Sequence, residues 1–169
     1  SDSKLAYVSN TGDGTLSEID LGTWKVIRQL EAGPTPEHLV FSKDERSIYI
    51  ASDRTGKVSV LDVASGKIEK SFAIGKKMHG LDLGDDGKTL FVSDQVANKL
   101  VALDPETGTM RSVELSPAPY HLGVIHGTGK VYVSSRNKPV VWVGDQKKLV
   151  LLTTIDLPTG EGQPIAFSK

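Results

Sequence analysis

The chain has 169 residues, 38% of them hydrophobic, which is enough to bury a core as one domain spanning residues 1–169. Its 20 basic and 21 acidic residues nearly cancel and no basic cluster stands out, which argues against a nucleic-acid partner. No apolar run reaches the roughly eighteen residues of a membrane span. The chain lacks cysteine, which excludes disulfides and thiol chemistry and leaves the cellular compartment open.

Short β-strands separated by turns are predicted from the first residues onward. A strand with a central aromatic residue recurs at 5–10, 48–53, 90–94 and 131–135. The strand after it ends each time in an acidic turn, in which Asp20 is followed by aspartates at intervals of 42, 42 and 41 residues. Residues 57–63 alternate polar and apolar side chains, and Gly66 suits the positive φ of a hairpin turn. The pattern predicts antiparallel hairpins rather than helices.

A third marker closes each copy of the repeat. It reads Pro-Glu-His-Leu-Val-Phe-Ser at 36–42, and related segments occur at 78–83, 120–125 and 163–168. Four copies of one four-stranded unit of about 42 residues therefore fill the chain. A unit of this length repeated in tandem is typical of the blades of a β-propeller, an all-β fold in which neighbouring sheets stack face to face.

Two groups of residues are interpreted as structural. The turn aspartates are expected to cap their turns through side-chain oxygens; they are Asp53, Asp62, Asp94 and Asp104. Trp24 and Trp142 are expected to fill space between elements rather than to bind a ligand.

The repeat resembles the YVTN-repeat family of β-propellers. The resemblance is carried by Tyr-Val-Ser-Asn at 7–10, by an Ile-Asp turn with Thr or Ser-Gly-Lys, and by Pro-x-His-x-x-x-Ser at 36–42. It covers all 169 residues and implies a periplasmic or cell-surface location. The family is also similar to the propeller domain that holds d1-type haem in nitrite reductases. Such propellers usually close seven or eight blades, whereas this chain supplies four.

The phase of the repeat leaves the closure of the ring open. The chain enters on a second strand and leaves on a first strand, so the last strand, at 165–168, is expected to complete the first blade. Three arrangements compete: a closed four-bladed ring, two chains that build one eight-bladed ring by exchanging the C-terminal strand, and a fragment of a longer polypeptide. The two-chain ring and the fragment are favoured because blades of this type suit large rings. Ser1 at the start is compatible with a processed mature form.

Three histidines occupy the same repeat position. His38, His79 and His121 are 41 and 42 residues apart, just before the expected innermost strand, where their side chains would converge on the mouth of the central channel. Neutral imidazole is a ligand for zinc, copper and haem iron, so one interpretation is an axial metal or haem site. The alternative is that each His pins its inter-blade loop by a hydrogen bond. The fourth copy has Pro164 at this position with Gln163 beside it, and His126 is expected on the surface.

Two functions follow from these observations. The favoured one is a non-enzymatic propeller outside the cytoplasm that binds a protein or a small molecule, with the channel mouth as its binding site and no cofactor. The other is a redox or enzymatic propeller in which the axial histidines hold copper or a haem. No Ser-His-Asp order, phosphate-binding loop or dinucleotide fingerprint supports catalysis by side chains alone.

Overall fold

The computed structural model describes residues 4–159, which form fifteen β-strands and no helix. Blade 1 contains β1 (Leu5–Asn10), β2 (Thr15–Asp20) and β3 (Lys25–Glu31). Blade 2 contains β4 (Pro36–Phe41), β5 (Ser47–Ser52), β6 (Lys57–Asp62) and β7 (Lys67–Ala73). Blade 3 contains β8 (Met78–Leu83), β9 (Leu90–Asp94), β10 (Lys99–Leu103) and β11 (Met110–Glu114). Blade 4 contains β12 (Pro119–Ile125), β13 (Lys130–Ser135), β14 (Val140–Asp145) and β15 (Val150–Asp156).

Each blade is an antiparallel meander whose strands pair in chain order. Blades 2, 3 and 4 have four strands, and blade 1 has three among the described residues. The all-β propeller architecture predicted from the repeat is therefore confirmed. The strand expected at 165–168 to complete blade 1 lies outside the described residues. The described part of the chain also holds no helix long and apolar enough to cross a membrane.

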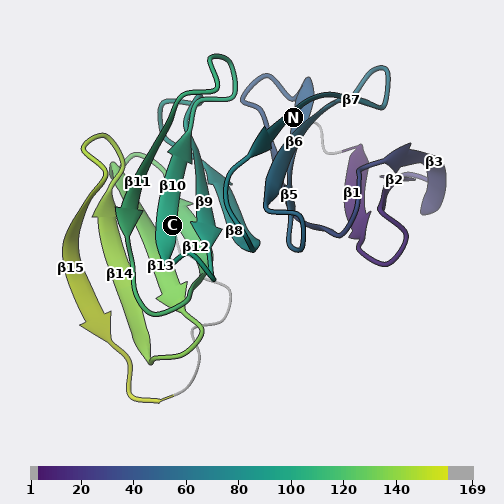
Figure 1. Ribbon diagram of the computed structural model, residues 1–169. Coiled ribbons are helices and arrows are strands. Elements are labelled where there is room, and N and C mark those ends of the chain that lie inside the picture. The colour runs from purple at the N-terminus through teal and green to yellow at the C-terminus, as the bar shows by residue number, and fades with distance from the viewer. Residues whose placement is uncertain (1–3, 160–169) are drawn as a thin grey trace.

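The four blades stack side by side in an open arc, with blades 1 and 4 at its two ends (Figure 1). The innermost strands β4, β8 and β12 pack against one another in sequence, and β1 contacts β4. A closed ring of four blades is not formed by residues 4–159.

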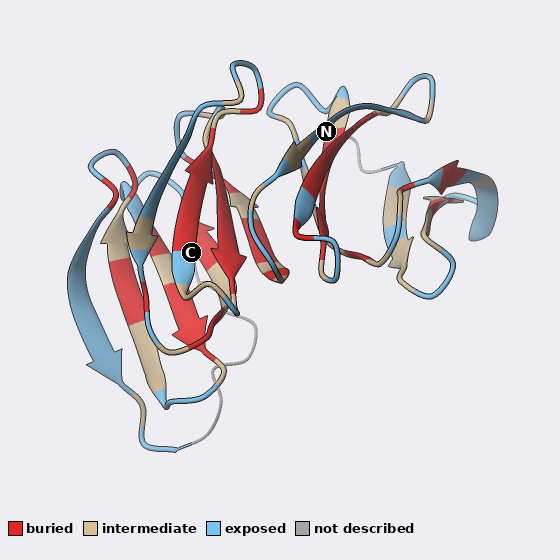
Figure 2. Cartoon of the chain, viewed as in Figure 1, coloured by how far each residue is buried: buried red, intermediate tan, exposed pale blue. Residues whose placement is uncertain are grey.

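Three hydrophobic clusters occupy the three seams between neighbouring blades. Seam 1–2 is represented by Leu16, Ile48 and Leu61, seam 2–3 by Tyr49, Val58 and Leu90, and seam 3–4 by Phe91, Val131 and Trp142. Most of the buried residues lie on the inner and middle strands, whereas the outer strands β7 and β15 are almost wholly exposed (Figure 2). The core is thus divided among the seams, and each blade depends on its neighbours for burial.

An aspartate closes the turn between the last two strands of every blade. Its Oδ1 accepts a hydrogen bond from the backbone amide three residues later, at 2.6 to 3.2 Å, for Asp20, Asp62, Asp104 and Asp145. Asp94 caps its own turn through the amides of Val96 and Ala97, as predicted. The prediction is wrong for Asp53. Its Oδ1 is buried without a hydrogen-bond partner among the described residues, 4.0 Å from Lys77 Nζ.

The residue after these aspartate turns adopts a left-handed conformation. Gly66 and Gly108 have φ of 68° and 76°, which glycine tolerates without strain. In blades 1 and 4 the same position holds Trp24 and Leu149, with φ of 57° and 53°. The Trp24 side chain is 79% exposed, so the expectation that it fills space is wrong, whereas Trp142 is buried as expected.

Replacing Trp24 by Gly is expected to raise the free energy of unfolding by about 1 kcal/mol, because glycine removes the steric penalty of the left-handed conformation. Urea denaturation of Trp24→Gly and Trp24→Ala would separate backbone strain from loss of the side chain. An alanine variant as stable as the glycine variant would contradict this explanation.

Candidate functional site

His38, His79 and His121 lie inside the innermost strands β4, β8 and β12, at the second or third residue of each strand. The sequence placed them just before these strands. In each blade the antiparallel register to the second strand shifts across the histidine, which marks a β-bulge. A bulge leaves a residue out of the regular pairing and re-aims its side chain. The three histidines therefore lie at equivalent bulges of adjacent blades.

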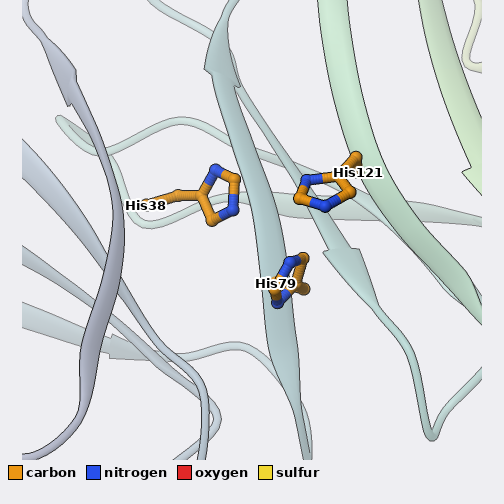
Figure 3. Close-up of side chains that lie close together, drawn as sticks. All are labelled: His38, His79 and His121. Atoms are coloured by element: carbon orange, nitrogen blue, oxygen red, sulfur yellow. The ribbon is translucent and has the colours of Figure 1, made fainter. Parts of the chain in front are cut away.

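The three side chains converge at one point, as the position in the repeat predicted (Figure 3). The ring centroids are 4.8 Å apart for His38 and His79, 4.6 Å for His79 and His121, and 5.3 Å for His38 and His121. One nitrogen from each ring can be chosen so that all three lie within 4.8 Å of one another. Three segments far apart in the sequence thus present their potential ligand atoms to a common centre.

All three imidazoles are held in the neutral form. Burial, with further contributions from the nearby His38 and His121, lowers the pKa of His79 to about 3. Burial also lowers the pKa of His38, with a contribution from His121, and that of His121. Neutral imidazole is the form that binds metal ions, so no proton has to leave before a metal can bind at neutral pH.

The Nε2 atom of His79 is buried and has no hydrogen-bond partner among the described residues. In the alternative interpretation each histidine pins its inter-blade loop, which requires a hydrogen bond from a nitrogen of the imidazole ring. Leaving a buried polar atom unpaired costs about 1–3 kcal/mol, and such atoms in native structures call for an explanation. A ligand bound by this nitrogen would supply the missing partner.

Tyr120 is a member of the site that the sequence reasoning missed. Its ring stacks on that of His79, with centroids 3.8 Å apart and planes 10° from parallel. The guanidinium of Arg136 lies over the Tyr120 ring, 4.9 Å from its centroid. The available signal was the aromatic residue directly before His121, at a position where the other copies have Glu37 and Met78.

Charged residues lie beside the three histidines at the seam of blades 2 and 3. Lys77 Nζ is 4.0 Å from Asp53 Oδ1. Burial raises the pKa of the Glu37 carboxyl, with a further contribution from the charge of Asp53, while Lys77 opposes it. Gln163, predicted at the channel mouth, lies outside the described residues. His126 is exposed, as expected, with its Nδ1 3.3 Å from Asp85 Oδ1.

The donor set fits a single metal ion better than a haem. Three neutral imidazoles with one position left open are the ligand set of a class of zinc sites, and imidazole also suits copper, iron and nickel. Haem iron accepts protein ligands only at its two axial positions, on opposite sides of the macrocycle. Three imidazoles that meet at one point do not match that requirement.

Fold and site together define a β-propeller with a cluster of histidines on its innermost strands. A family model described as YNCE-like beta-propeller matches residues 1–87. The chain belongs to this family, which agrees with the resemblance to YVTN-type propellers.

Among solved structures, the chain is similar to a chain of the hydrazine synthase of Kuenenia stuttgartiensis, with 20% sequence identity and a TM-score of 0.83. The superposition covers 92% of this chain and 47% of that chain. The chain thus spans about half the length of that relative, and at this identity the likeness shows the fold alone. No curated protein matches the sequence.

The metal-free protein is expected to lose stability as the pH falls from 6.5 toward 3. The unfolded chain takes up a proton on His79 near pH 6.5, whereas the folded chain does so only near its pKa of about 3, so protonation favours unfolding throughout this window. Urea denaturation of wild type at pH 7 and pH 5 should show the loss, and His79→Gln should show a smaller one. His126→Gln, in the exposed histidine, is the control, and equal losses in all three proteins would contradict the prediction.

Proposed function

We propose that this propeller is an extracytoplasmic binding protein whose ligand is a divalent transition-metal ion held by His38, His79 and His121. The observation that carries the proposal is the convergence of three imidazole nitrogens within 4.8 Å. A metal bound to imidazole has bonds of about 2.0–2.1 Å, which puts the nitrogens of a tetrahedral site roughly 3.3 Å apart. Small rotations of the side chains bridge that difference.

The burial of the cluster supports binding over a merely repeated consensus residue. All three rings are at least partly removed from water, and all three have lowered pKa values, which keeps them competent as ligands. Imidazole ligands select for zinc, copper, iron or nickel rather than for calcium or magnesium, which prefer oxygen ligands. Location outside the cytoplasm is supported by the resemblance to YVTN-type propellers, and cell fractionation of the source organism tests it.

Calorimetric titration of metal-free protein with Zn²⁺ is expected to show one ion per chain, and Cu²⁺ is expected to bind more tightly because imidazole sites follow the Irving–Williams order. Replacing His38, His79 or His121 by Ala should each weaken Zn²⁺ binding by more than about tenfold. His126→Ala is the matched control. Zn²⁺ binding that is absent in wild type, or unaffected by all three substitutions, would sink the metal site. An intense Soret band in protein from its source would favour a haem instead.

The second part of the proposal concerns the partner that covers the ends of the arc. Val8 in blade 1 and Ile50 in blade 2 occupy the same repeat position, yet Val8 is 47% exposed and Ile50 is fully buried. Ile50 packs against the preceding blade, whereas none of the described blades precedes blade 1. At the other end, Phe91 of blade 3 is fully buried against blade 4, whereas its counterpart Tyr132 in blade 4 is only partly buried. Each end therefore presents a face shaped for another blade.

A second copy of the chain supplies both missing neighbours. Two four-bladed arcs related by a twofold axis cover both faces at two equivalent seams and give one eight-bladed ring. The strand at 165–168, whose exchange was predicted, lies outside the described residues. The support for the two-chain ring is therefore the pair of partly exposed faces on blades 1 and 4.

Light scattering of the wild-type protein at micromolar concentration is expected to give twice the chain mass. Val8→Lys should give the monomer mass, because a buried charge at the seam is costly. Thr55→Lys, in an exposed turn of blade 2, is the control. A wild-type monomer at all concentrations tested would refute the two-chain ring.

A further inference from the structure

The seam between blades 3 and 4 brings the two histidine-bearing strands unusually close at Gly80. A Cβ atom added at Gly80 would lie 2.7 Å from the carbonyl oxygen of Tyr120 and 2.7 Å from the amide nitrogen of Leu122. Both of these are backbone atoms of β12, so a side chain could fit only if the strand moved. The equivalent positions in blades 2 and 4 hold Leu39 and Leu122, so the repeat itself does not require glycine there.

A single buried hydroxyl ties the same two strands together. The Oγ of Ser93, in β9, accepts a hydrogen bond from the Gly80 amide at 2.8 Å and donates one to the Tyr120 carbonyl. Gly80 directly follows His79, and Tyr120 directly precedes His121. Ser93 is fully buried, so no water competes for these bonds.

Among residues 4–159, no other seam has a hydroxyl that joins two histidine-bearing strands. At seam 1–2, Ser9 Oγ donates to the Glu37 carbonyl at 2.9 Å, which supports the strand that carries His38. At seam 2–3 the equivalent residue is Ala51, which has no hydroxyl. The pair His79 and His121 is the one joined through a common hydroxyl, and its ring centroids are the closest of the three pairs, at 4.6 Å.

The same contact aligns the aromatic stack. By holding the Tyr120 carbonyl, Ser93 fixes the backbone from which the Tyr120 ring reaches His79, where the two rings stack at 3.8 Å. The orientation of the His79 ring, and therefore the direction of its unpaired Nε2 atom, depends on this stack.

We propose that Gly80 and Ser93 are positioning residues that set the separation and orientation of His79 and His121 as a pair of metal ligands. Gly80 permits the close approach of β8 and β12, and Ser93 locks it. The inference is based on the proposed metal site, because it assigns these residues a role in ligand geometry. Neither residue touches the ion.

The primary test removes the hydroxyl without adding atoms. Co²⁺, whose visible absorption reports its coordination geometry, is titrated into metal-free wild type, Ser93→Ala and Gly80→Ala. Residues that orient metal ligands typically contribute about 10- to 100-fold to affinity, so both variants are expected to bind Co²⁺ at least about tenfold more weakly, with an altered spectrum. Wild-type affinity and spectrum in folded Ser93→Ala would overturn the proposal.

Two matched controls separate positioning from general loss of packing. Ser59→Ala removes a buried hydroxyl in blade 2, where Ser59 Oγ lies 2.8 Å from Ser71 Oγ, away from the histidines. Gly12→Ala adds a methyl group where nothing lies within 4 Å. Both controls are expected to keep Co²⁺ affinity within about twofold of wild type. A tenfold loss in Ser59→Ala as well would show that the effect of Ser93 is not specific.

A measurement without metal keeps this inference distinct from the proposed function. Magnetisation transfer between the Tyr120 and His79 rings is measured by NMR in the metal-free proteins. We expect to observe it in wild type and in Ser59→Ala. In Ser93→Ala we expect it to be lost. Should wild type fail to bind Co²⁺, the proposed function fails, and the NMR result alone decides whether Ser93 orients His79. Ring contacts that persist in Ser93→Ala would refute the role of Ser93.

Discussion

Face-to-face stacking of blades is the constraint on which the rest of this structure depends. A single antiparallel blade of this length has apolar side chains on both faces, as β6 shows with four consecutive buried residues. It can bury both faces only between two neighbours. The seams therefore hold the core, the innermost strands are brought side by side, and their bulges meet. The histidine cluster is a consequence of that stacking rather than of any local motif, because each histidine comes from a different blade.

The repeat period made most of the fold predictable. Aromatic and aspartate positions at intervals of about 42 residues located the strands, and residues such as Asp62 and Gly66 identified the turns, because turn chemistry is local. The two failures have different causes, one local and one not. Trp24 occupies the turn position that Gly66 fills in the next blade, so its ring points into solvent rather than into a seam. Asp53 resembles a turn cap in the sequence, but its oxygen is turned toward Lys77 across a seam.

The candidate site was predictable in part. A shared repeat position was enough to foresee that His38, His79 and His121 meet on the axial side. It could not place them within β-bulges, because a bulge is a register shift between two strands and leaves no fixed sequence signature. Nor could it find Tyr120 or Ser93, which act across a seam. Contacts between blades depend on how closely two strands approach, and residues such as Gly80 reveal that distance only when both strands are seen together.

Each of blades 2, 3 and 4 contributes one histidine to the cluster, so the number of potential metal ligands depends on how often the repeat has been duplicated. His38, His79 and His121 come from the same position of a duplicated unit. A tandem duplication that adds one blade therefore also adds one potential donor at the same place on the innermost strand. Evolution can then adjust the number of ligands by substituting that position in single copies, as Pro164 in the fourth copy illustrates at the level of sequence. In the proposed metal site, seam residues such as Gly80 and Ser93 supply the asymmetry that a defined geometry needs. In the proposed site, duplication supplies the histidines, and residues that differ between the seams set the orientation of each histidine side chain.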